Sequence, residues 1–192
     1  MFNTKKIVYT GILAGIGIIL SFLEFGLPIF PSFLKIDFSF LPAILTALLF
    51  SPFFGVVVSL IINAFHLLRT QTGGVGELAN VLVSIAFVLP VGYIYMKNKT
   101  KKRAVIGLII SILSMTLVGC LANYYILIPF YSKMMPIDAI IKMVPGAHSI
   151  IDYIIYAILP FNLLKGFLLS VVVFLLYKSL SRLINGVKSG TN

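Results

Sequence analysis

The chain has 192 residues, of which 60% are hydrophobic and only 10% are charged, and its mean hydropathy is +1.11. This composition excludes an ordinary soluble domain, and the length leaves room for about six apolar spans of roughly 20 residues and little else. The sequence therefore predicts an all-α integral membrane bundle of six transmembrane helices, which forms a single domain over residues 1–192.

The net charge of +10 is distributed unevenly along the chain. Ten of the fifteen basic residues have no acidic neighbour: Lys5, Lys6, Lys97, Lys99, Lys101, Lys102, Arg103, Lys178, Arg182 and Lys188. Because basic residues flank apolar spans on the cytoplasmic side, we expect both termini and the 97–103 run to be cytoplasmic. The other five bases lie among all five acids, and we expect this balanced set outside. The cations flank membrane spans, so no nucleic-acid partner is expected.

The expected spans are, in chain order, about 7–24, 38–50, 53–68, 77–96, 105–128 and 161–183. The second and third are short as a pair, which predicts that one of them is tilted or stops part-way. Pro129 is expected to end the fifth helix and Pro160 to begin the sixth. The connection between them is expected to hold a short surface helix at 138–144, and residues 149–159 form either another surface helix or a re-entrant segment.

Ionisable and amide side chains at bilayer depth each require a partner or a function, because an unpaired charge there costs about 2.5–3.5 kcal/mol. Asn162 and Lys165 lie three residues apart, on one face of the last span. Together they offer donors to carbonyl oxygens or ring nitrogens. In the alternative interpretation, Lys165 extends to the outer headgroups.

Asn123 lies in the outer half of the fifth span and is followed by Tyr124 and Tyr125. A buried amide beside aromatic rings suits a planar polar heterocycle, with hydrogen bonds at its edge and packing on its face. The alternative is an amide that only joins two helices of the bundle.

Two further pairs of polar residues lie near the expected outer face. Glu77 and Asn80 open the fourth span, where the carboxylate either complements the helix terminus or accepts hydrogen bonds from ligand hydroxyls. Lys35 and Asp37 lie on the connection after the first span. An exposed ion pair there would contribute little, whereas a loop over the mouth of a bundle is a natural lid.

Catalytic and metal chemistry find little support in the sequence. His66 and His148 are isolated and lack metal-ligand spacing, so no metal site is expected. The glycines at 73–76 lack the Lys-Ser/Thr of a phosphate-binding loop, and no motif pairs a nucleophile with a base.

In the first span, Gly11, Ala14 and Gly15 form a small-residue face that serves either packing within the bundle or contact with another helix.

Three motifs resemble the substrate-binding S components of energy-coupling factor (ECF) vitamin transporters, most closely the riboflavin-specific members. The segment 35–42, Lys-Ile-Asp-Phe-Ser-Phe-Leu-Pro, is similar to the family's Lys-x-Asp-Phe-Ser-Asp-x-Pro. Residues 74–80 contain Gly-Glu-Leu-Ala-Asn, and Asn123 through Pro129 with Asn162 and Lys165 is similar to the flavin-recognising positions. The likeness covers nearly the whole chain, but Phe40 replaces an acid, and Gly11 and Gly15 replace a pair of alanines.

The resemblance implies a protein that is not an enzyme and carries no cofactor. It would capture riboflavin outside and release it inside after joining a membrane coupling (T) protein and two ATP-binding subunits, whose ATP hydrolysis topples it in the bilayer. The resemblance implies riboflavin contacts from Asn123, Asn162, Lys165, Glu77, Asn80, Tyr124, Lys35 and Asp37, and docking through Gly11, Ala14 and Gly15. An S component for another vitamin or heterocycle, and a small membrane enzyme or assembly factor, remain alternatives.

Overall fold

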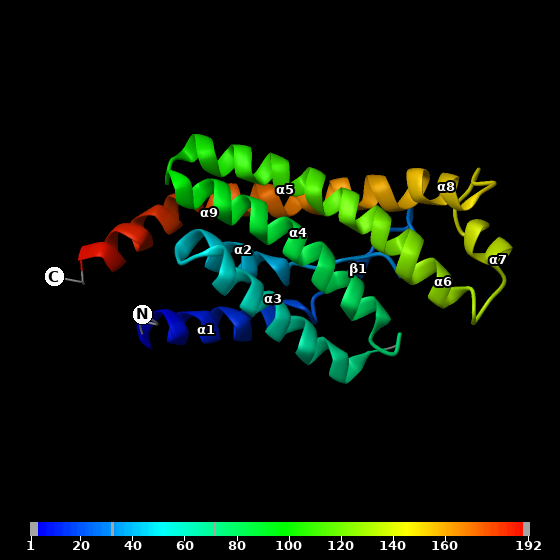
Figure 1. Ribbon diagram of the computed structural model, residues 1–192, viewed down its shortest axis with the longest axis horizontal. Helices are drawn as coiled ribbons and strands as arrows, with labels where there is room; N and C mark the ends of the chain where they lie inside the picture. The colour runs from blue at the N-terminus through cyan, green and yellow to red at the C-terminus, as the bar shows by residue number, and fades with distance from the viewer. Residues whose placement is uncertain (1–3, 32, 71, 190–192) are drawn as a thin grey trace.

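The computed structural model describes residues 4–31, 33–70 and 72–189, and their side chains as far as residue 176. Its elements are α1 (Thr4–Leu20), β1 (Phe25–Gly26), β2 (Lys35–Ile36), α2 (Phe40–Leu49), α3 (Pro52–His66), the 3-10 turn η1 (Leu67–Arg69), α4 (Val75–Lys97), α5 (Lys101–Ala122), the π-helical turn η2 (Asn123–Leu127), α6 (Ile128–Tyr131), α7 (Ile137–Ile141), α8 (Ile150–Tyr153), the π-helical turn η3 (Ile154–Ile158) and α9 (Leu159–Ser189). The long helices run side by side (Figure 1), and the two short strands pair antiparallel. This strand pair is the one exception to the predicted all-α fold within the described residues.

Four helical segments of the described chain are long and apolar enough to cross a membrane: 52–69, 75–97, 101–131 and 150–176. They overlap the third to sixth predicted spans, but the last segment begins at residue 150 rather than at the predicted 161. The first helix, α1, has 17 residues, and α2 has 10. At 1.5 Å per residue, α2 covers roughly half of a hydrocarbon layer of about 30 Å. The expected short member of the helix pair is therefore α2, and the count of six spans stays a prediction.

Both prolines that were predicted to bound helices lie inside continuous helices, so these boundaries are wrong. The fifth helix continues past Pro129 to Tyr131, and the last begins at Ile150 and continues past Pro160. Residues 149–159 are therefore neither a separate surface helix nor a re-entrant segment. The predicted helix at 138–144 is present as the shorter α7.

Two π-helical turns explain how the helices accommodate these prolines. Each turn ends two residues before a proline, and the N–H that follows it bonds to the carbonyl five residues back: Ile128 to Asn123, and Leu159 to Ile154. A proline ring clashes with the carbonyl four residues back in a regular α-helix. The wider π turn relieves that clash and lets the helix continue.

The beginning of α1 and the end of α9 lie at the same end of the bundle. The segment that carries the two strands (residues 24–31 and 33–37), which we call the β1–β2 connection, lies toward the other end with α6 and α7 (Figure 1). This arrangement agrees with termini on one side, while the side itself stays a prediction. The basic residues Lys178, Arg182 and Lys188 lie beyond the described side chains.

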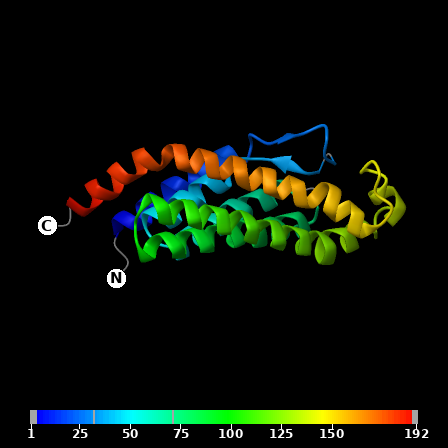
Figure 2. The same cartoon turned by 90° about the horizontal axis from the view of Figure 1, so that it is seen from above.

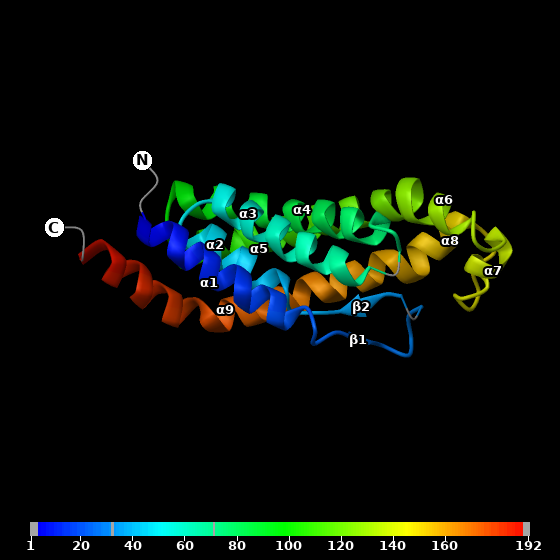
Figure 3. The same cartoon turned by 90° about the horizontal axis from the view of Figure 1, so that it is seen from below.

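Buried apolar side chains form two separate clusters. The bundle cluster joins α1 to α5 with α9 and includes Phe40, Met115 and Leu169. The loop-end cluster joins the β1–β2 connection with α6 to α9 and includes Ile36 and Phe161. Figures 2 and 3 show the β1–β2 connection beside the first half of α9, which it covers.

The glycine at position 55 allows α2, α3 and α4 to approach closely. A methyl group there would lie 2.7 Å from the Ala43 carbonyl oxygen, the Ala47 side chain and the Val88 side chain. We expect Gly55→Ala to lower the free energy of unfolding by about 1–3 kcal/mol through overpacking, measured by thermal unfolding in detergent. Gly11→Ala is the matched control, because nothing lies within 4 Å of its added methyl group. Equal stability of the two variants would contradict the close packing.

Candidate functional site

Four polar side chains lie along the chain between residues of the two apolar clusters: Asp37, Asn123, Asn162 and Lys165. On the loop, Asp37 lies between Ile36 of the loop-end cluster and Phe40 of the bundle cluster. On α9, the amide and the ammonium lie between Phe161 and Leu169, which belong to different clusters. Asn123 likewise lies between Met115 of the bundle cluster on α5 and Ile128 of the loop-end cluster on α6. We refer to these four residues as the polar layer.

A buried ion pair joins the loop to the last helix. The Lys165 ammonium donates to Asp37 Oδ2 at 2.8 Å, and the two side chains are 6% and 14% exposed. The same ammonium lies 4.5 Å from the centroid of the Phe40 ring, a cation–π distance. Lys165 therefore does not extend to the headgroups, and the aromatic ring at position 40 contacts the cation.

The turn at Asp37 aims its carboxylate at α9. The Ser39 backbone N–H donates to Asp37 Oδ1 at 2.9 Å, and the Ser39 hydroxyl bonds the same oxygen. Burial by itself would raise the pKa of the Asp37 carboxyl, but the Lys165 charge and the hydrogen bonds from Lys165 and Ser39 outweigh burial. The pKa of Asp37 therefore lies below its ordinary value of 3.8.

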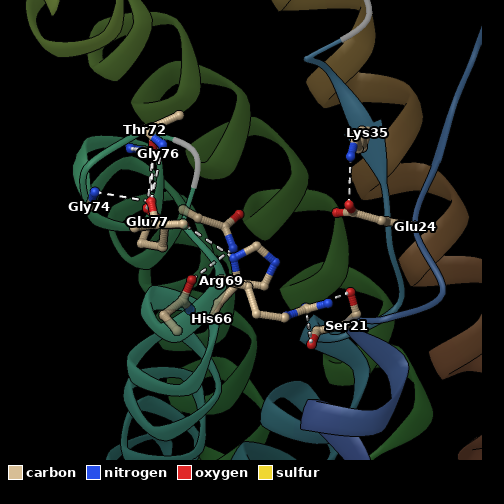
Figure 4. Close-up of polar contacts among 12 residues, drawn as sticks. Ser21, Glu24, Lys35, His66, Arg69, Thr72, Gly74, Gly76 and Glu77 are labelled. Carbon is tan, nitrogen blue, oxygen red and sulfur yellow. Dashed lines mark hydrogen bonds and ion pairs between the residues drawn. The ribbon is translucent and has the colours of Figure 1, made fainter.

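Lys35 does not join Asp37, although only one residue separates them. Its ammonium pairs with Glu24 Oε1 at 2.6 Å, and both side chains are partly exposed (Figure 4). The pair closes the two ends of the β1–β2 connection. Lys35 thus lies outside the polar layer, and its role near a ligand stays a prediction.

Asn123 and Asn162 meet at one glycine of α5. The Asn123 amide donates to the Gly119 carbonyl at 2.8 Å, and the Asn162 amide donates to the Ile158 carbonyl at 2.8 Å. A methyl group on Gly119 would lie 2.8 Å from the amide atoms of Asn162, so the glycine lets that amide rest against α5. The asparagines are 6% and 5% exposed, which places both inside the bundle. Asn123 is the first residue of the π turn η2, and Asn162 lies just after the π turn η3. Such turns are frequent at functional sites.

Glu77 organises the turn that precedes α4. Its carboxylate accepts from the hydroxyls of Thr70 at 2.8 Å and Thr72 at 3.1 Å, and lies 3.3 Å from His66 Nδ1 (Figure 4). The turn itself has Gly74 at a φ of +92°, a left-handed conformation that favours glycine. These contacts account for Glu77 without a ligand, and its predicted ligand role is untested.

Asn80 has a partner that the sequence interpretation missed. Its amide donates to Asn63 Oδ1 at 2.8 Å, and Asn63 donates to the Ser59 carbonyl at 2.8 Å. Asn63 and Ser59 lie four residues apart on α3, and His66 follows three residues later. This helical period among polar residues was the signal available in the sequence.

Tyr124 lies away from the polar layer. Its side chain is 43% exposed and contacts Tyr125 edge-to-face, with ring centroids 4.9 Å apart. The neighbouring Asn123 points inward. The structure therefore does not bring the Tyr124 ring together with the amide.

The small-residue face of α1 divides into two parts. Gly11 and Gly15 are exposed, and a methyl group on either would meet nothing within 4 Å. Ala14 is buried in the bundle cluster. Packing within the bundle therefore explains Ala14, and only the two glycines form an open face.

The ion pair between Lys165 and Asp37 can be tested by a double-mutant cycle. Because either single change leaves a buried charge unpaired, we expect Lys165→Met and Asp37→Asn each to lower the free energy of unfolding by roughly 3 kcal/mol. The double variant should lose less than the sum of both. Thermal unfolding in detergent measures all four proteins, and additive losses would contradict the pairing.

The exposed pair supplies the control for this cycle. Lys35→Met, which breaks the contact with Glu24, should cost less than about 1 kcal/mol. The acid dependence gives a second check. Because the pKa of Asp37 is lowered on folding, its contribution should be complete above about pH 4 and decline below it. Asp37→Asn should lack this decline.

Comparison with known proteins identifies the family. Residues 5–177 match the family model for the ECF transporter, substrate-specific component. The chain is 32% identical to "Riboflavin transporter RibU" from Staphylococcus aureus (strain TCH60), over 97% of this chain and 96% of that one. It is 30% identical to "Riboflavin transporter FmnP" from Bacillus subtilis (strain 168), over 91% of each chain.

A solved structure, described as "Structure and mechanism of the S component of a bacterial ECF transporter", has the same fold. Its TM-score to this chain is 0.78 at 31% identity, and the match covers 94% of this chain and 97% of that one. Together with the four membrane-length helices, these similarities show that the chain is a membrane protein of the family of substrate-specific components of ECF transporters.

Proposed function

We propose that this protein is the riboflavin-binding subunit of an ECF-type uptake transporter. The observation that carries the proposal is the polar layer, because three of its members are no more than 6% exposed within an apolar bundle. Polar groups at this depth are expensive and commonly mark a substrate pathway. The relatives named as riboflavin transporters direct the choice of ligand.

The chemistry of the polar layer suits the edge of an isoalloxazine ring. Asn123 and Asn162 each use one amide N–H on a backbone carbonyl, which leaves each of them a second N–H donor and a carbonyl oxygen acceptor. The Lys165 ammonium has three donors and uses one of them on Asp37. The pyrimidine-like edge of riboflavin alternates carbonyl acceptors with an imide N–H donor. Its two carbonyls require donors, which the remaining N–H bonds of Lys165 and of an asparagine amide would supply, and its imide N–H requires an acceptor, which an amide carbonyl oxygen would supply.

The β1–β2 connection is proposed to act as the lid of the site. It is held to α9 by the Lys165–Asp37 pair and by an edge-to-face contact between Phe30 and Phe161, with centroids 5.4 Å apart. Opening it exposes the polar layer, and closing it restores both contacts. Glu77, Asn80 and Lys35 are proposed to lie near the ribityl chain or this lid.

The transport cycle is proposed to require partners. Six spans with cytoplasmic termini would open the lid end to the outside, where riboflavin is captured. A membrane coupling (T) protein and two ATP-binding subunits would then supply the ATP hydrolysis that drives release inside. The open face of Gly11 and Gly15 on α1 is the proposed contact with the T protein, because it admits a close helix.

Riboflavin binding tests the proposal directly. Detergent-purified protein should show the yellow absorbance of a flavin, and the apoprotein should quench the fluorescence of added riboflavin. Lys165→Ala and Asn123→Ala should each weaken binding by at least about tenfold, since each removes one hydrogen-bonding group from the ring edge. A colourless protein that binds no riboflavin, or one that prefers a different heterocycle in competition, would contradict the proposal.

Two glycines of the same helix provide a matched control. Gly119→Ala pushes on the Asn162 amide, whereas Gly107→Ala places a methyl group 3.1 Å from Val91 Cα, away from the polar layer. Both variants overpack α5, but only Gly119→Ala should weaken riboflavin binding. Equal binding by the two variants would count against Asn162 as a ligand contact.

A further inference from the structure

Three polar pairs cross the contact between α3 and α4 in one antiparallel register: Ser59 with Ser84, Asn63 with Asn80, and His66 with Glu77. The serine hydroxyls bond each other inside the bundle. The His66–Glu77 pair lies at the turn that precedes α4. The middle pair joins two amides, and its orientation is informative because an amide has one end that donates and one that accepts.

The backbone sets the orientation of both amides. Asn63 Nδ2 lies 2.8 Å from the Ser59 carbonyl oxygen, which can only accept. Asn63 must therefore turn its own oxygen toward α4, and the atom of Asn80 that lies 2.8 Å from it must be the donating nitrogen. The carbonyl oxygen of Asn80 is thus directed away from Asn63.

That carbonyl oxygen is the free acceptor on this face of α4. It accepts no hydrogen bond from any residue within the described ranges, and Asn80 is partly exposed. Glu77, one turn earlier, already has its carboxylate engaged by Thr70, Thr72 and His66. A ligand hydroxyl that approaches this part of α4 would therefore find its acceptor on Asn80.

We propose that Asn63 is a positioning residue, which fixes the Asn80 amide so that its carbonyl oxygen accepts a hydrogen bond from a hydroxyl of the ligand's sugar-alcohol chain. This proposal rests on riboflavin as the ligand. It assigns to Asn63, which needs no contact with the ligand, a share of the discrimination between flavins with and without hydroxyls. Without Asn63 the Asn80 amide can rotate and present a donor or an acceptor, so the orientation is no longer prepared before binding.

Two flavins separate this role from a merely structural one. Lumiflavin has the isoalloxazine ring but lacks the ribityl hydroxyls, so it cannot use the Asn80 oxygen. We expect Asn63→Leu to weaken riboflavin binding roughly tenfold, as expected for one hydrogen bond, and to leave lumiflavin binding unchanged. Fluorescence titration of the detergent-purified full chain gives both dissociation constants and their ratio.

Ser59→Ala is the matched control. It removes the neighbouring polar pair of the same helix contact but keeps the backbone carbonyl that orients Asn63. This variant should keep the riboflavin-to-lumiflavin ratio of the wild type. If Asn63→Leu does not yield folded protein, Asn63→Ser replaces it, because its shorter side chain cannot hold Asn80 and the same change in ratio is expected.

The outcomes distinguish the two levels of the proposal. A wild type that binds riboflavin, together with an Asn63 variant whose ratio is unchanged, overturns the positioning role alone. A loss shared equally by both flavins, or larger for lumiflavin, overturns it as well. A wild type that binds neither flavin overturns the proposed function, and the role of Asn63 with it.

Discussion

A lysine buried in an apolar bundle dictates much of this structure. The Lys165 ammonium is too costly to leave unpaired at such depth, and no acid lies near it on α9. Its partner comes from Asp37, 128 residues away. Satisfying one charge therefore fixes the β1–β2 connection against the last helix. The same pairing places the carboxylate and the ammonium together, with the ammonium over the Phe40 ring of the bundle cluster.

The other two members of the polar layer, Asn123 and Asn162, lie at the two π turns. Each widens a helix just before a proline and lies beside an asparagine whose amide bonds a carbonyl one turn back. Each helix thereby accommodates a proline that would otherwise break it. The two turns lie near Gly119, where Asn123 and Asn162 come together. The proposed binding residues and the helix distortion therefore coincide, as is common for π turns.

Local patterns in the sequence predicted the membrane bundle and the polar residues inside it. Hydropathy placed three spans within a few residues of their helices and a fourth in partial overlap, and the cost of burying amides and an ammonium singled out Asn123, Asn162 and Lys165. The proline positions misled the prediction at Pro129 and Pro160, because a π turn leaves no clear mark in composition. The contact of Asp37 with Lys165 was not predictable, since it depends on how distant segments pack.

The directions of side chains account for most of the remaining differences between the prediction and the structure. Tyr124 follows Asn123 directly, yet on a helix adjacent residues point about 100° apart, so one is exposed while the other is buried. The same geometry separates Ala14 from Gly15 on α1. Asn63 was overlooked because it matches no motif, although its spacing from Ser59 and His66 follows the helical period. Its proposed positioning role rests on the Ser59 carbonyl that orients it.

The central claim is that the polar layer is the ligand site, and an experimental structure of the riboflavin-saturated protein tests it most directly. The account predicts the isoalloxazine edge within hydrogen-bond distance of the Asn123 and Asn162 side-chain amides and the Lys165 ammonium, beneath the β1–β2 connection. A flavin bound elsewhere, with the Lys165–Asp37 pair and both amides sealed from it, would contradict the account.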